Sequence, residues 1–298
     1  MVNILLSTYN GAAYIEEQLD SIWKQEYSDF RLYIRDDGSK DNTVTVVEKW
    51  LIDNDAQNKV ELIVGDNKGF CRSFGELLCK ANSGDYWFFC DQDDIWLPNK
   101  LVRAVEYLSK EKEEKPLVYH GSFQCVDDNQ NVIREYVLKG ENYSFRKSLT
   151  SSICYGFTMA INDKMRKLLI QSDFSKIQSH DWYVAMIATA FGKIIFDEEI
   201  VAKHRIHSKN NSPNSFMQKV KKGSEMLAGT SFYTNNIREF YKQYSPMLSL
   251  EQDNMLVKFL NYKYCFRDSV YKACYPQRWN TSWSVEFFLR ILMLIGKI

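Results

Sequence analysis

Short apolar segments alternate with segments of helical periodicity through the first half of this chain of 298 residues. The apolar segments, which predict strands, are 2–7, 32–35, 60–64 and 86–90. The helical segments that follow them are 15–25, 42–51, 70–81 and 100–110. A strand followed each time by a helix is typical of a parallel sheet wound by right-handed crossovers. The first half is therefore expected to be an α/β sheet.

The alternation stops near residue 144. Before that point, 117–120 continues the sheet and 122–134 predicts a hairpin around Asp127-Asp128-Asn129. After it, helices near 163–171 and 181–190 flank short strands near 157–161 and 193–197. Beyond Pro213 the pattern is mainly helical and closes with 283–298. The change of composition predicts a boundary near 210, with 1–210 as one domain and 211–298 as a helical region.

Charge is distributed unevenly along the chain although the formal net charge is +0. Residues 203–298 hold 15 Lys and Arg against 6 Asp and Glu, whereas residues 1–202 hold 23 against 32. Such a division indicates two functional regions, with the basic one facing an anionic surface. The tail carries no nucleic-acid-binding motif, so an anionic membrane or a lipid-linked substrate is favoured over nucleic acid.

The cysteines and the chain ends are typical of a cytoplasmic protein. The 7 cysteines are odd in number and show no C-x-x-C spacing, which favours reduced, packed thiols. Residues 1–7 lack a positive segment and are expected to form a strand, not a signal peptide. The longest apolar stretch near the end, 287–295, is interrupted by Arg290 and is too short to span a bilayer.

Each of the four predicted strands ends in polar residues of types that bind ligands. These are Ser-Thr-Tyr-Asn-Gly (7–11), Asp-Asp-Gly-Ser (36–39), Asp-Asn-Lys-Gly (66–69) and Asp-Gln-Asp-Asp (91–94). Turns use the same residue types, so one such loop indicates little. The carboxyl ends of parallel strands meet at one edge of a sheet, however, and open α/β sheets bind ligands there. Four loops together predict a site for a nucleotide, whose ribose and base can be bound by acidic side chains.

Three carboxylates, Asp91, Asp93 and Asp94, follow the apolar run 86–90 within four residues. Carboxylates this close repel one another unless a cation lies between them. The loop therefore predicts oxygen ligands for a divalent cation that holds a phosphate. The alternative is a solvated acidic loop in which Asp94 caps a helix that starts near Pro98. The other three strand ends favour the metal site.

The order Ser-Thr-Tyr-Asn, Arg-Asp-Asp-Gly-Ser, Asn-Lys-Gly and Asp-Gln-Asp-Asp resembles glycosyltransferase family 2, which are inverting enzymes of the GT-A fold. Asp-Gln-Asp-Asp-Ile-Trp-Leu-Pro-Asn-Lys-Leu (91–101) is similar to the bacterial rhamnosyltransferase branch of that family. The resemblance covers about residues 1–210. It implies a Rossmann-like, mostly parallel sheet flanked by helices, followed by a helical C-terminal region.

The resemblance also implies roles for the matched residues. Those assigned to the donor nucleotide are Thr8, Tyr9, Asn10, Asp36, Asp37, Asn67, Gly69, Asp91 and Arg205. Within this set Asp36 and Asp37 would lie near the base and ribose, and Asn67 and Gly69 would shape the loop under the donor. In the D-x-D motif, Asp93 would ligate Mg²⁺ or Mn²⁺, and Asp91 would lie near the ribose or the metal.

Asp181 opens the helical stretch that begins Ser-His-Asp-Trp (179–182). Family enzymes carry an acidic pair here, and its Asp is the catalytic base. This sequence has His180 in the preceding position, so Asp181 is the candidate base. A base must lie within hydrogen-bond reach of the acceptor hydroxyl. The alternative, that Asp181 caps the helix, is compatible with the same role.

Arg205 and His207 belong to the segment 203–211, which resembles the family's Tyr-Arg-x-His-x-x-Asn. On an extended segment the two side chains point to one side. Arg suits a diphosphate, and His can ligate the metal or donate to phosphate. The alternative is a surface β-edge, and His204 and His180 are expected to be structural.

Three residues are expected on the acceptor side. Gly156 lies in a segment that resembles the family's Gly-Cys-Thr-Met, and Trp96 and Trp182 could stack on sugar rings. The alternatives are a buried strand in which Gly allows a close approach, and two core tryptophans.

Taken together, these features imply an inverting, metal-dependent transferase that acts at the inner face of the cell membrane. The branch resemblance implies transfer of L-rhamnose from dTDP-L-rhamnose to a growing cell-wall or capsular polysaccharide on a lipid carrier. The tail would contact the membrane peripherally through 287–295, or would form a packed subdomain or a homodimer contact.

Other donors and other classes of protein stay open. A UDP-hexose or UDP-N-acetylhexosamine donor is compatible with the same motifs, and so is a non-catalytic nucleotide-sugar-binding protein. A sugar-phosphate nucleotidyltransferase is disfavoured because the loop after the first strand lacks a Gly-rich, basic phosphate-binding sequence.

Overall fold

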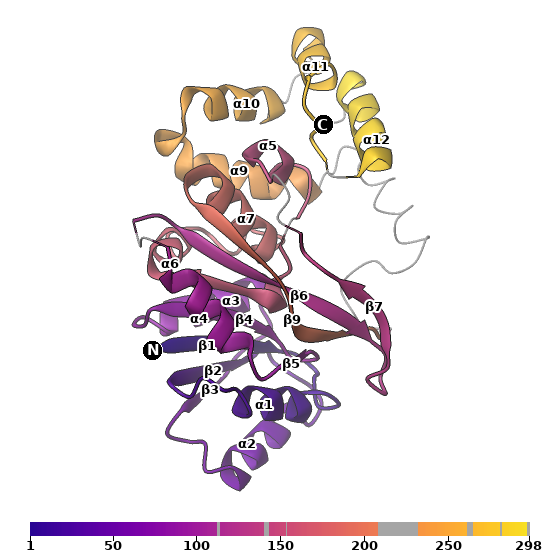
Figure 1. Ribbon diagram of the computed structural model, residues 1–298. Helices are drawn as coiled ribbons and strands as arrows, with labels where there is room; N and C mark the ends of the chain where they lie inside the picture. Colours follow the sequence, from indigo (N-terminus) through magenta and orange to yellow (C-terminus); the bar gives the residue numbers. More distant parts are fainter. Residues whose placement is uncertain are drawn as a thin grey trace.

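The computed structural model describes residues 1–111, 114–139, 143–152, 154–207, 232–260, 265–280 and 282–296. A single sheet runs through it in the order β3-β2-β1-β4-β8-β6-β9-β5, with β7 paired to β6 (Figure 1). The strands are β1 (Val2–Thr8), β2 (Phe30–Asp36), β3 (Val60–Val64), β4 (Tyr86–Asp91), β5 (Ile95–Trp96), β6 (Leu117–Val126), β7 (Val132–Tyr136), β8 (Met159–Asn162) and β9 (Lys193–Arg205). The predicted α/β class is confirmed.

Helices cover both faces of this sheet and then continue beyond it. They are α1 (Ile15–Trp23), α2 (Thr43–Asp53), α3 (Phe70–Lys80), α4 (Lys100–Ser109), α5 (Phe145–Ser148), α6 (Asp163–Leu169), α7 (His180–Phe191), α9 (Phe232–Tyr244), α10 (Leu250–Leu260), α11 (Phe266–Ala273) and α12 (Trp283–Leu294).

Four strands, β3, β2, β1 and β4, form the parallel part of the sheet. Side chains alternate along β1: Ile4 and Leu6 pack in the cluster that contains α1, α2 and α4, whereas Leu5 packs with α3 and α7. Both faces are therefore buried, which explains why each of these strands is a continuous apolar run. Because the four strands point the same way, β1, β2 and β4 end together at residues 8, 36 and 91.

The rest of the sheet is mixed. Strand β8 is antiparallel to both β4 and β6, and β6 is parallel to β9. Strand β5 pairs antiparallel with β9 at Ile95 and Trp96, which brings the end of β9 to the loop after β4. The predicted hairpin is present as β6 and β7, with Gln130 at positive φ in the turn.

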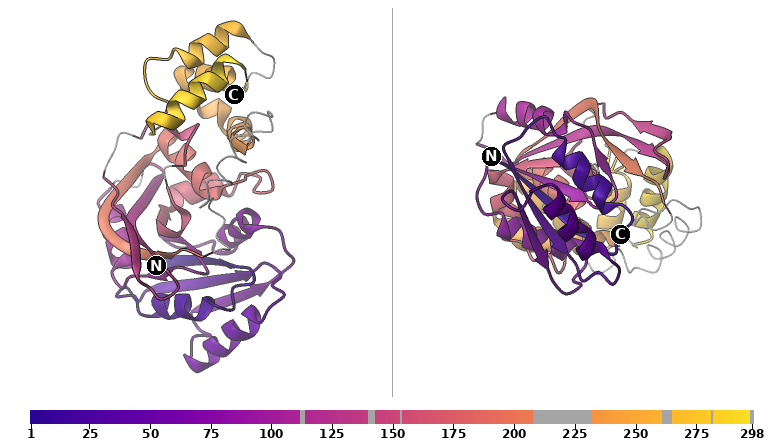
Figure 2. Two further views of the ribbon diagram at one scale, coloured as in Figure 1. Left: turned by 90° about the vertical axis from the view of Figure 1, so that its right-hand side faces the viewer. Right: turned by 90° about the horizontal axis from the view of Figure 1, so that it is seen from below.

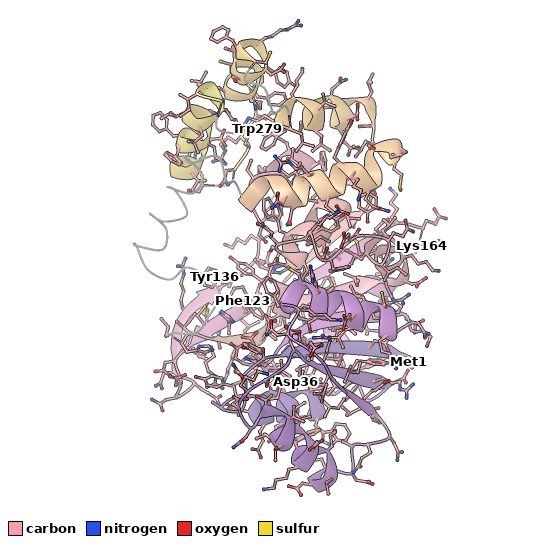
Figure 3. The ribbon with its side chains drawn as sticks, turned by 180° about the vertical axis from the view of Figure 1, so that it is seen from behind. Met1, Asp36, Phe123, Tyr136, Lys164 and Trp279 are labelled. Atoms are coloured by element: carbon pink, nitrogen blue, oxygen red, sulfur yellow. The ribbon has the colours of Figure 1, made fainter. Side chains whose placement is uncertain are left out.

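The C-terminal helices α9 to α12 stack at the end of the molecule opposite α2 (Figures 1 and 2). The labelled Trp279 lies at that end, far from Asp36 at the sheet (Figure 3), and it is fully buried. Ile237, Phe240 and Tyr244 of α9 belong to the same apolar core as α7 and β4. The predicted boundary near 210 lies outside the described residues.

No helix in the described ranges is both long enough and apolar enough to cross a membrane. All 7 cysteines are free thiols.

Candidate functional site

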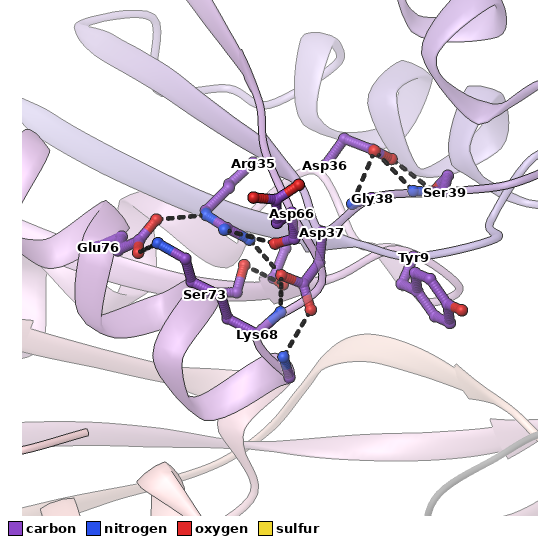
Figure 4. Close-up of polar contacts among 12 residues, drawn as sticks. Tyr9, Arg35, Asp36, Asp37, Gly38, Ser39, Asp66, Lys68, Ser73 and Glu76 are labelled. Carbon is purple, nitrogen blue, oxygen red and sulfur yellow. Dashed lines mark hydrogen bonds and ion pairs between the residues drawn. The ribbon is translucent and has the colours of Figure 1, made fainter. Parts of the chain in front are cut away.

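Gln92, the residue between the two aspartates of the D-x-D motif, ties the end of β1 to the loop after β4. Its side-chain oxygen accepts hydrogen bonds from the Thr8 hydroxyl at 2.6 Å and from Tyr9 N at 2.8 Å. Its amide nitrogen donates to Tyr9 O at 3.1 Å. Thr8 is buried, whereas the Tyr9 ring is exposed and stands apart from the neighbouring polar network (Figure 4). Of these two predicted nucleotide contacts, only the Tyr9 ring is presented at the surface.

Asn10 and Asp36 shape the loops beside Tyr9. Asn10 has a positive φ of 50°, and its side-chain oxygen accepts from Lys40 N at 2.7 Å. The Asp36 carboxylate accepts from Gly38 N at 3.1 Å and Ser39 N at 2.9 Å (Figure 4). The Asp36 carboxylate, which was expected near base or ribose, is thus already bound to backbone N–H groups of its own turn.

Asp37 is part of a buried ion-pair network (Figure 4). Its carboxylate accepts from the Arg35 guanidinium and from the backbone N–H groups of Lys68 at 2.8 Å and Gly69 at 2.7 Å. Arg35 also donates to Glu76 of α3 at 2.7 Å. Asp37 therefore links β2 to the loop before α3, a structural role that its predicted place near the nucleotide did not include.

Asn67 and Gly69 lie in the loop that Asp37 holds. Gly69 precedes α3 with φ of 83°, and a methyl group added to it would meet no atom within 4 Å. Asn67 is exposed, and its backbone N lies 2.9 Å from where a Cβ on Gly38 would be. The loops after β2 and β3 are therefore in close contact, as the convergence of strand ends predicts.

The acidic loop after β4 concentrates negative charge in a poorly solvated place. Burial, followed by the charges of Asp94 and Asp93, raises the pKa of Asp91 well above its usual range. Burial and the charge of Asp94 also raise the pKa of Asp93, against the hydrogen bond from His207, which lowers it. One buried oxygen of Asp94, Oδ2, has no hydrogen-bond partner among the described residues. Such a cluster favours an added positive charge.

His204 supplies one positive charge to this loop. Its Nδ1 lies 2.6 Å from Asp94 Oδ1, and its ring stacks on Phe157 at 4.7 Å. Burial alone would lower the pKa of His204, but the charge and hydrogen bond of Asp94 raise it to about 9. Helix α4 begins at Lys100, after Asn99, so Asp94 does not cap it. Asp94 is instead the partner of a protonated histidine.

Arg205 and His207 lie against the same loop, as their alternation along the chain predicts. His207 Nε2 is 2.8 Å from Asp93 Oδ2, and its ring stacks on Tyr14 at 4.9 Å. Arg205 is buried, donates to the Glu17 carboxylate and lies 3.4 Å from the carbonyl oxygen of Asp93. A diphosphate that binds Arg205 would therefore compete with Glu17.

Asp91, Asp93 and His207 are the predicted ligands of a divalent cation, which would also need oxygens of a bound diphosphate. In the described part of the chain, no three His, Cys, Asp or Glu side chains are grouped so that they could hold a metal by themselves. Mg²⁺ in nucleotide sites is commonly bound by one or two carboxylates together with substrate phosphates. The raised pKa values of both aspartates indicate that their shared space favours a cation, so the ligand assignment stays a prediction that the chemistry supports.

Asp181, the predicted base, lies in the first turn of α7. Its Oδ1 accepts from Trp182 N at 2.7 Å and from the Ser179 hydroxyl. Its charge also contributes, more weakly than burial and the nearer aspartates, to the raised pKa of Asp91. The ring of the preceding residue, His180, packs on Phe89 of β4 at 5.1 Å between centroids, which places the start of α7 beside the end of that strand. The residue at the N-cap of α7 is Ser179, and Asp181 binds an N–H group within the first turn, so its role as base stays a prediction.

His180 and Gly156 lie beside Asp181. The buried His180 ring packs against Phe74 and Phe89 at 4.4 and 5.1 Å between centroids, and neither ring nitrogen has a partner among the described residues. Burial lowers the pKa of His180, so its ring is neutral. A Cβ on Gly156 would lie 2.8 Å from His180 Nε2. Gly156 therefore permits the close approach that places α7.

Trp96 and Trp182 are each only 2% exposed. The Lys100 ammonium lies 3.9 Å from the centre of the Trp96 ring, and Trp182 Nε1 donates to Ser148 O. Neither ring presents a face to a sugar, so both have the core role that was the alternative expectation. Sequence alone did not separate these roles because an aromatic in an apolar pattern suits either.

Two residues at the site had no predicted role. Gln92 could have been recognised, because an amide between two strand-end aspartates can bond both to a backbone N–H and to a C=O. Lys100 is fully buried behind the acidic loop and donates to Phe157 O. Burial lowers the pKa of Lys100 to about 7, against the charges of Cys90, Asp94 and Asp91, which raise it. Its position at the start of a helix gave no sign of this burial.

Comparison with known sequences identifies related proteins. The family model for Glycosyl transferase family 2 matches residues 3–169. An uncharacterized glycosyltransferase of Rickettsia typhi is 26% identical over 73% of this chain and 68% of its own length. The dTDP-rhamnosyl transferase RfbG of Shigella flexneri is 34% identical over 35% of this chain and 36% of its own length. A UDP-Glc:alpha-D-GlcNAc-diphosphoundecaprenol beta-1,3-glucosyltransferase of Escherichia coli, WfgD, is 23% identical over 73% of this chain and 82% of its own.

Solved structures share the fold at low sequence identity. The S. aureus protein TarS, residues 1–349 in complex with UDP-GlcNAc, superposes with a TM-score of 0.56 at 17% identity, over 90% of this chain and 83% of that chain. A mannosyltransferase from Pyrobaculum calidifontis in complex with GDP-Man and Mn²⁺ superposes with a TM-score of 0.54 at 16% identity, over 99% of this chain and 85% of that chain.

Proposed function

This chain belongs to glycosyl transferase family 2 and has a GT-A fold, and we propose that it transfers L-rhamnose from dTDP-L-rhamnose to a growing cell-surface polysaccharide. The donor assignment is supported by the partial similarity to the dTDP-rhamnosyl transferase RfbG. The segment 91–101, which resembles the rhamnosyltransferase branch, also supports it. The acceptor would be a cell-wall or capsular polysaccharide on a lipid carrier, met at the cytoplasmic face of the membrane. A diphosphoundecaprenol-linked acceptor appears in the name of one relative, WfgD.

The observation that carries the proposal is the position of Asp181 at the start of α7, next to His180, whose ring packs on Phe89 two residues before Asp91. In the reaction, an acceptor hydroxyl oxygen bonds to the anomeric carbon while the bond from that carbon to the diphosphate breaks. Asp181 takes the hydroxyl proton, and the nucleoside diphosphate leaves with the bonding electron pair. Attack opposite the leaving group inverts the anomeric configuration, and one carboxylate base suffices.

The other residues bind and orient the donor. The exposed Tyr9 ring can stack on the base, and the loops that Asp36 and Asp37 hold form the walls around it. Asp93 and Asp91, with His207, would hold Mg²⁺ or Mn²⁺, which offsets the charge of the departing diphosphate. Arg205 could add a second positive charge to the diphosphate if the donor displaces Glu17 from it.

Replacement of Asp181 tests the base. Asp181→Asn should lower transfer by about 10²-fold to 10⁴-fold, the usual contribution of a general base, while donor binding persists. Asp163→Asn is a matched control, because Asp163 also lies in a first helical turn but pairs with Lys167 near the surface. Undiminished transfer by Asp181→Asn would assign the proton to another group. If the wild type itself binds donor but transfers nothing to any acceptor offered, the non-catalytic alternative is favoured.

A donor panel tests the sugar. Purified protein with Mn²⁺ is heated with dTDP-L-rhamnose, UDP-glucose, UDP-N-acetylglucosamine or GDP-mannose, and the unfolding midpoint is recorded. A ligand at 100 times its Kd stabilises the folded state by about 2.7 kcal/mol, so the true donor should stand out. Greater stabilisation by a UDP-sugar would favour the UDP-hexose or UDP-N-acetylhexosamine alternative.

A further inference from the structure

Helix α12 carries apolar side chains on two opposite sides. On one side Leu289, Leu292 and Met293 are buried in the shared core. The opposite side presents an exposed row at a spacing of about one turn, consisting of Trp283, Phe287, Ile291 and Leu294. Trp283 is 76% exposed and Phe287 is 70% exposed, so neither ring is part of the buried core. Large adjoining apolar side chains at a surface mark a contact site.

A basic group lies at one end of this row, and the carboxylate of the helix faces away from it. The single carboxylate of α12, Glu286, is buried on the core side, where it accepts from Trp279 N at 2.8 Å and pairs with Arg290 at 2.6 Å. The exposed row therefore carries no carboxylate. At its N-terminal end the Arg278 guanidinium lies 4.4 Å over the Trp283 ring. This arrangement agrees with the excess of basic residues in the last third of the chain.

We propose that the row Trp283, Phe287, Ile291 and Leu294 inserts into the headgroup region of a bilayer that contains anionic lipids. A helix of 12 residues is about 18 Å long, which suits a helix that lies in the plane of the interface and is too short to span the bilayer. Trp and Phe on the apolar side with Arg beside them is the composition of interfacial helices. The inference rests on the proposed function only in that a lipid-linked acceptor would be met at this surface.

A second copy of the chain is a poorer occupant of this face. The row is about 18 Å long and one helix, about 10 Å, wide, whereas a stable protein interface buries roughly 800 Å² on each partner. Two copies joined through it would also bring their basic groups together without opposing carboxylates. A bilayer needs no such area, because each inserted side chain contributes independently and the negative headgroups complement Arg278.

Vesicle binding tests the proposal without sugar donor or acceptor. The full chain should sediment with phosphatidylglycerol-containing vesicles and more weakly with pure phosphatidylcholine vesicles. Phe287→Glu should weaken binding by roughly tenfold or more, because burial of a Phe side chain contributes about that factor. Arg278→Gln should reduce the preference for anionic vesicles and leave binding to neutral ones unchanged.

Leu250→Glu on α10 is the matched control, because Leu250 is 79% exposed but lies outside the row. It should bind vesicles like the wild type, and all variants should keep the wild-type unfolding midpoint. Equal loss in Leu250→Glu and Phe287→Glu, or no binding by the wild type, would overturn the proposal. A fall in sedimentation coefficient of Phe287→Glu without vesicles would instead assign the row to a second copy. Vesicle binding by a protein that transfers no sugar would refute the proposed function alone.

Discussion

Gly156 fixes the position of the candidate base by having no side chain. A methyl group on it would lie 2.8 Å from His180 Nε2 and 3.8 Å from Asp181 Cβ. His180 cannot retreat, because its ring packs on Phe74 and Phe89. We expect Gly156→Ala to shift the start of α7 by a fraction of an ångström to about 1 Å and to lower transfer by roughly 100-fold. Initial rates of sugar transfer at saturating donor measure this effect.

The cause can be isolated by a second change. In Gly156→Ala combined with His180→Ala, the contacting ring atom is gone, so part of the lost rate should return. Donor-induced thermal stabilisation should be similar in all three proteins. Equal loss in the single and double variants would show that contact with the His180 ring is not the reason for Gly at 156.

Replacement of Asp37 distinguishes a structural role of its carboxylate from a role in nucleotide binding. Among the described residues, Asp37→Asn would leave the Arg35 guanidinium, which is 1% exposed, with the partly exposed Glu76 as its charged partner. Loss of one partner of a buried pair costs about 3–5 kcal/mol, so urea unfolding should show a decrease in that range. Asp66→Asn, which changes an exposed carboxylate in the adjoining loop after β3, should change stability by less than about 0.5 kcal/mol. Full stability with weakened donor binding in Asp37→Asn would favour the nucleotide role instead.

Strand β9 and the residues after it bring His204, Arg205 and His207 onto the acidic loop. The pKa of His204 is about 9 in the folded protein and about 6.5 in an unfolded chain. Its pairing with Asp94 therefore stabilises the fold fully below about pH 6.5, and this contribution is lost as the pH rises through about 9.

His204→Phe tests this pH dependence, because the ring can still stack on Phe157. At pH 7 the variant should be less stable than the wild type by on the order of 2 kcal/mol, the value for a hydrogen bond to a charged group. The difference should shrink as the pH is raised to 10. The titration of Lys100 changes stability with pH in the opposite direction. It occurs in both proteins, so the difference in stability between wild type and variant at each pH removes most of it. A difference that stays constant from pH 7 to 10 would show that His204 is neutral.

At this scale the four parallel strands could be predicted, whereas β5 and most of β9 could not. The strands β1 to β4 are continuous apolar runs because both faces are buried, and that pattern is visible in the sequence. Strand β5 has only two residues, too few for any periodicity. Strand β9 extends to Arg205, beyond the predicted 193–197. Its pairing with β6 shifts register near Gly121, and this break in the alternation hides the second half of the strand in the sequence pattern.

The same distinction holds for the site. The convergence of four strand-end loops follows from parallel topology, so sequence could place Asp36, Asp91 and Asp93 at one edge. Which partner each carboxylate takes could not be predicted. Asp37 forms an ion pair with Arg35, and Arg35 pairs in turn with Glu76, which is 41 residues away in the sequence. Such pairings arise from tertiary packing, which no local pattern records.

For the whole molecule, the sheet and the C-terminal helices share one core, which predicts a single unfolding transition. Phe240 of α9 is fully buried, stacks on Phe191 of α7 at 6.0 Å and contacts Tyr183 edge-on. Phe240→Ala should cost about 3–5 kcal/mol, and calorimetry should show the entire transition moving to lower temperature. Phe266→Ala, an exposed Phe on α11, should leave the transition in place. Two separate transitions, with only one of them shifted by Phe240→Ala, would mean that α9 to α12 unfold as an independent domain, and the division near residue 210 would then hold in its strict sense.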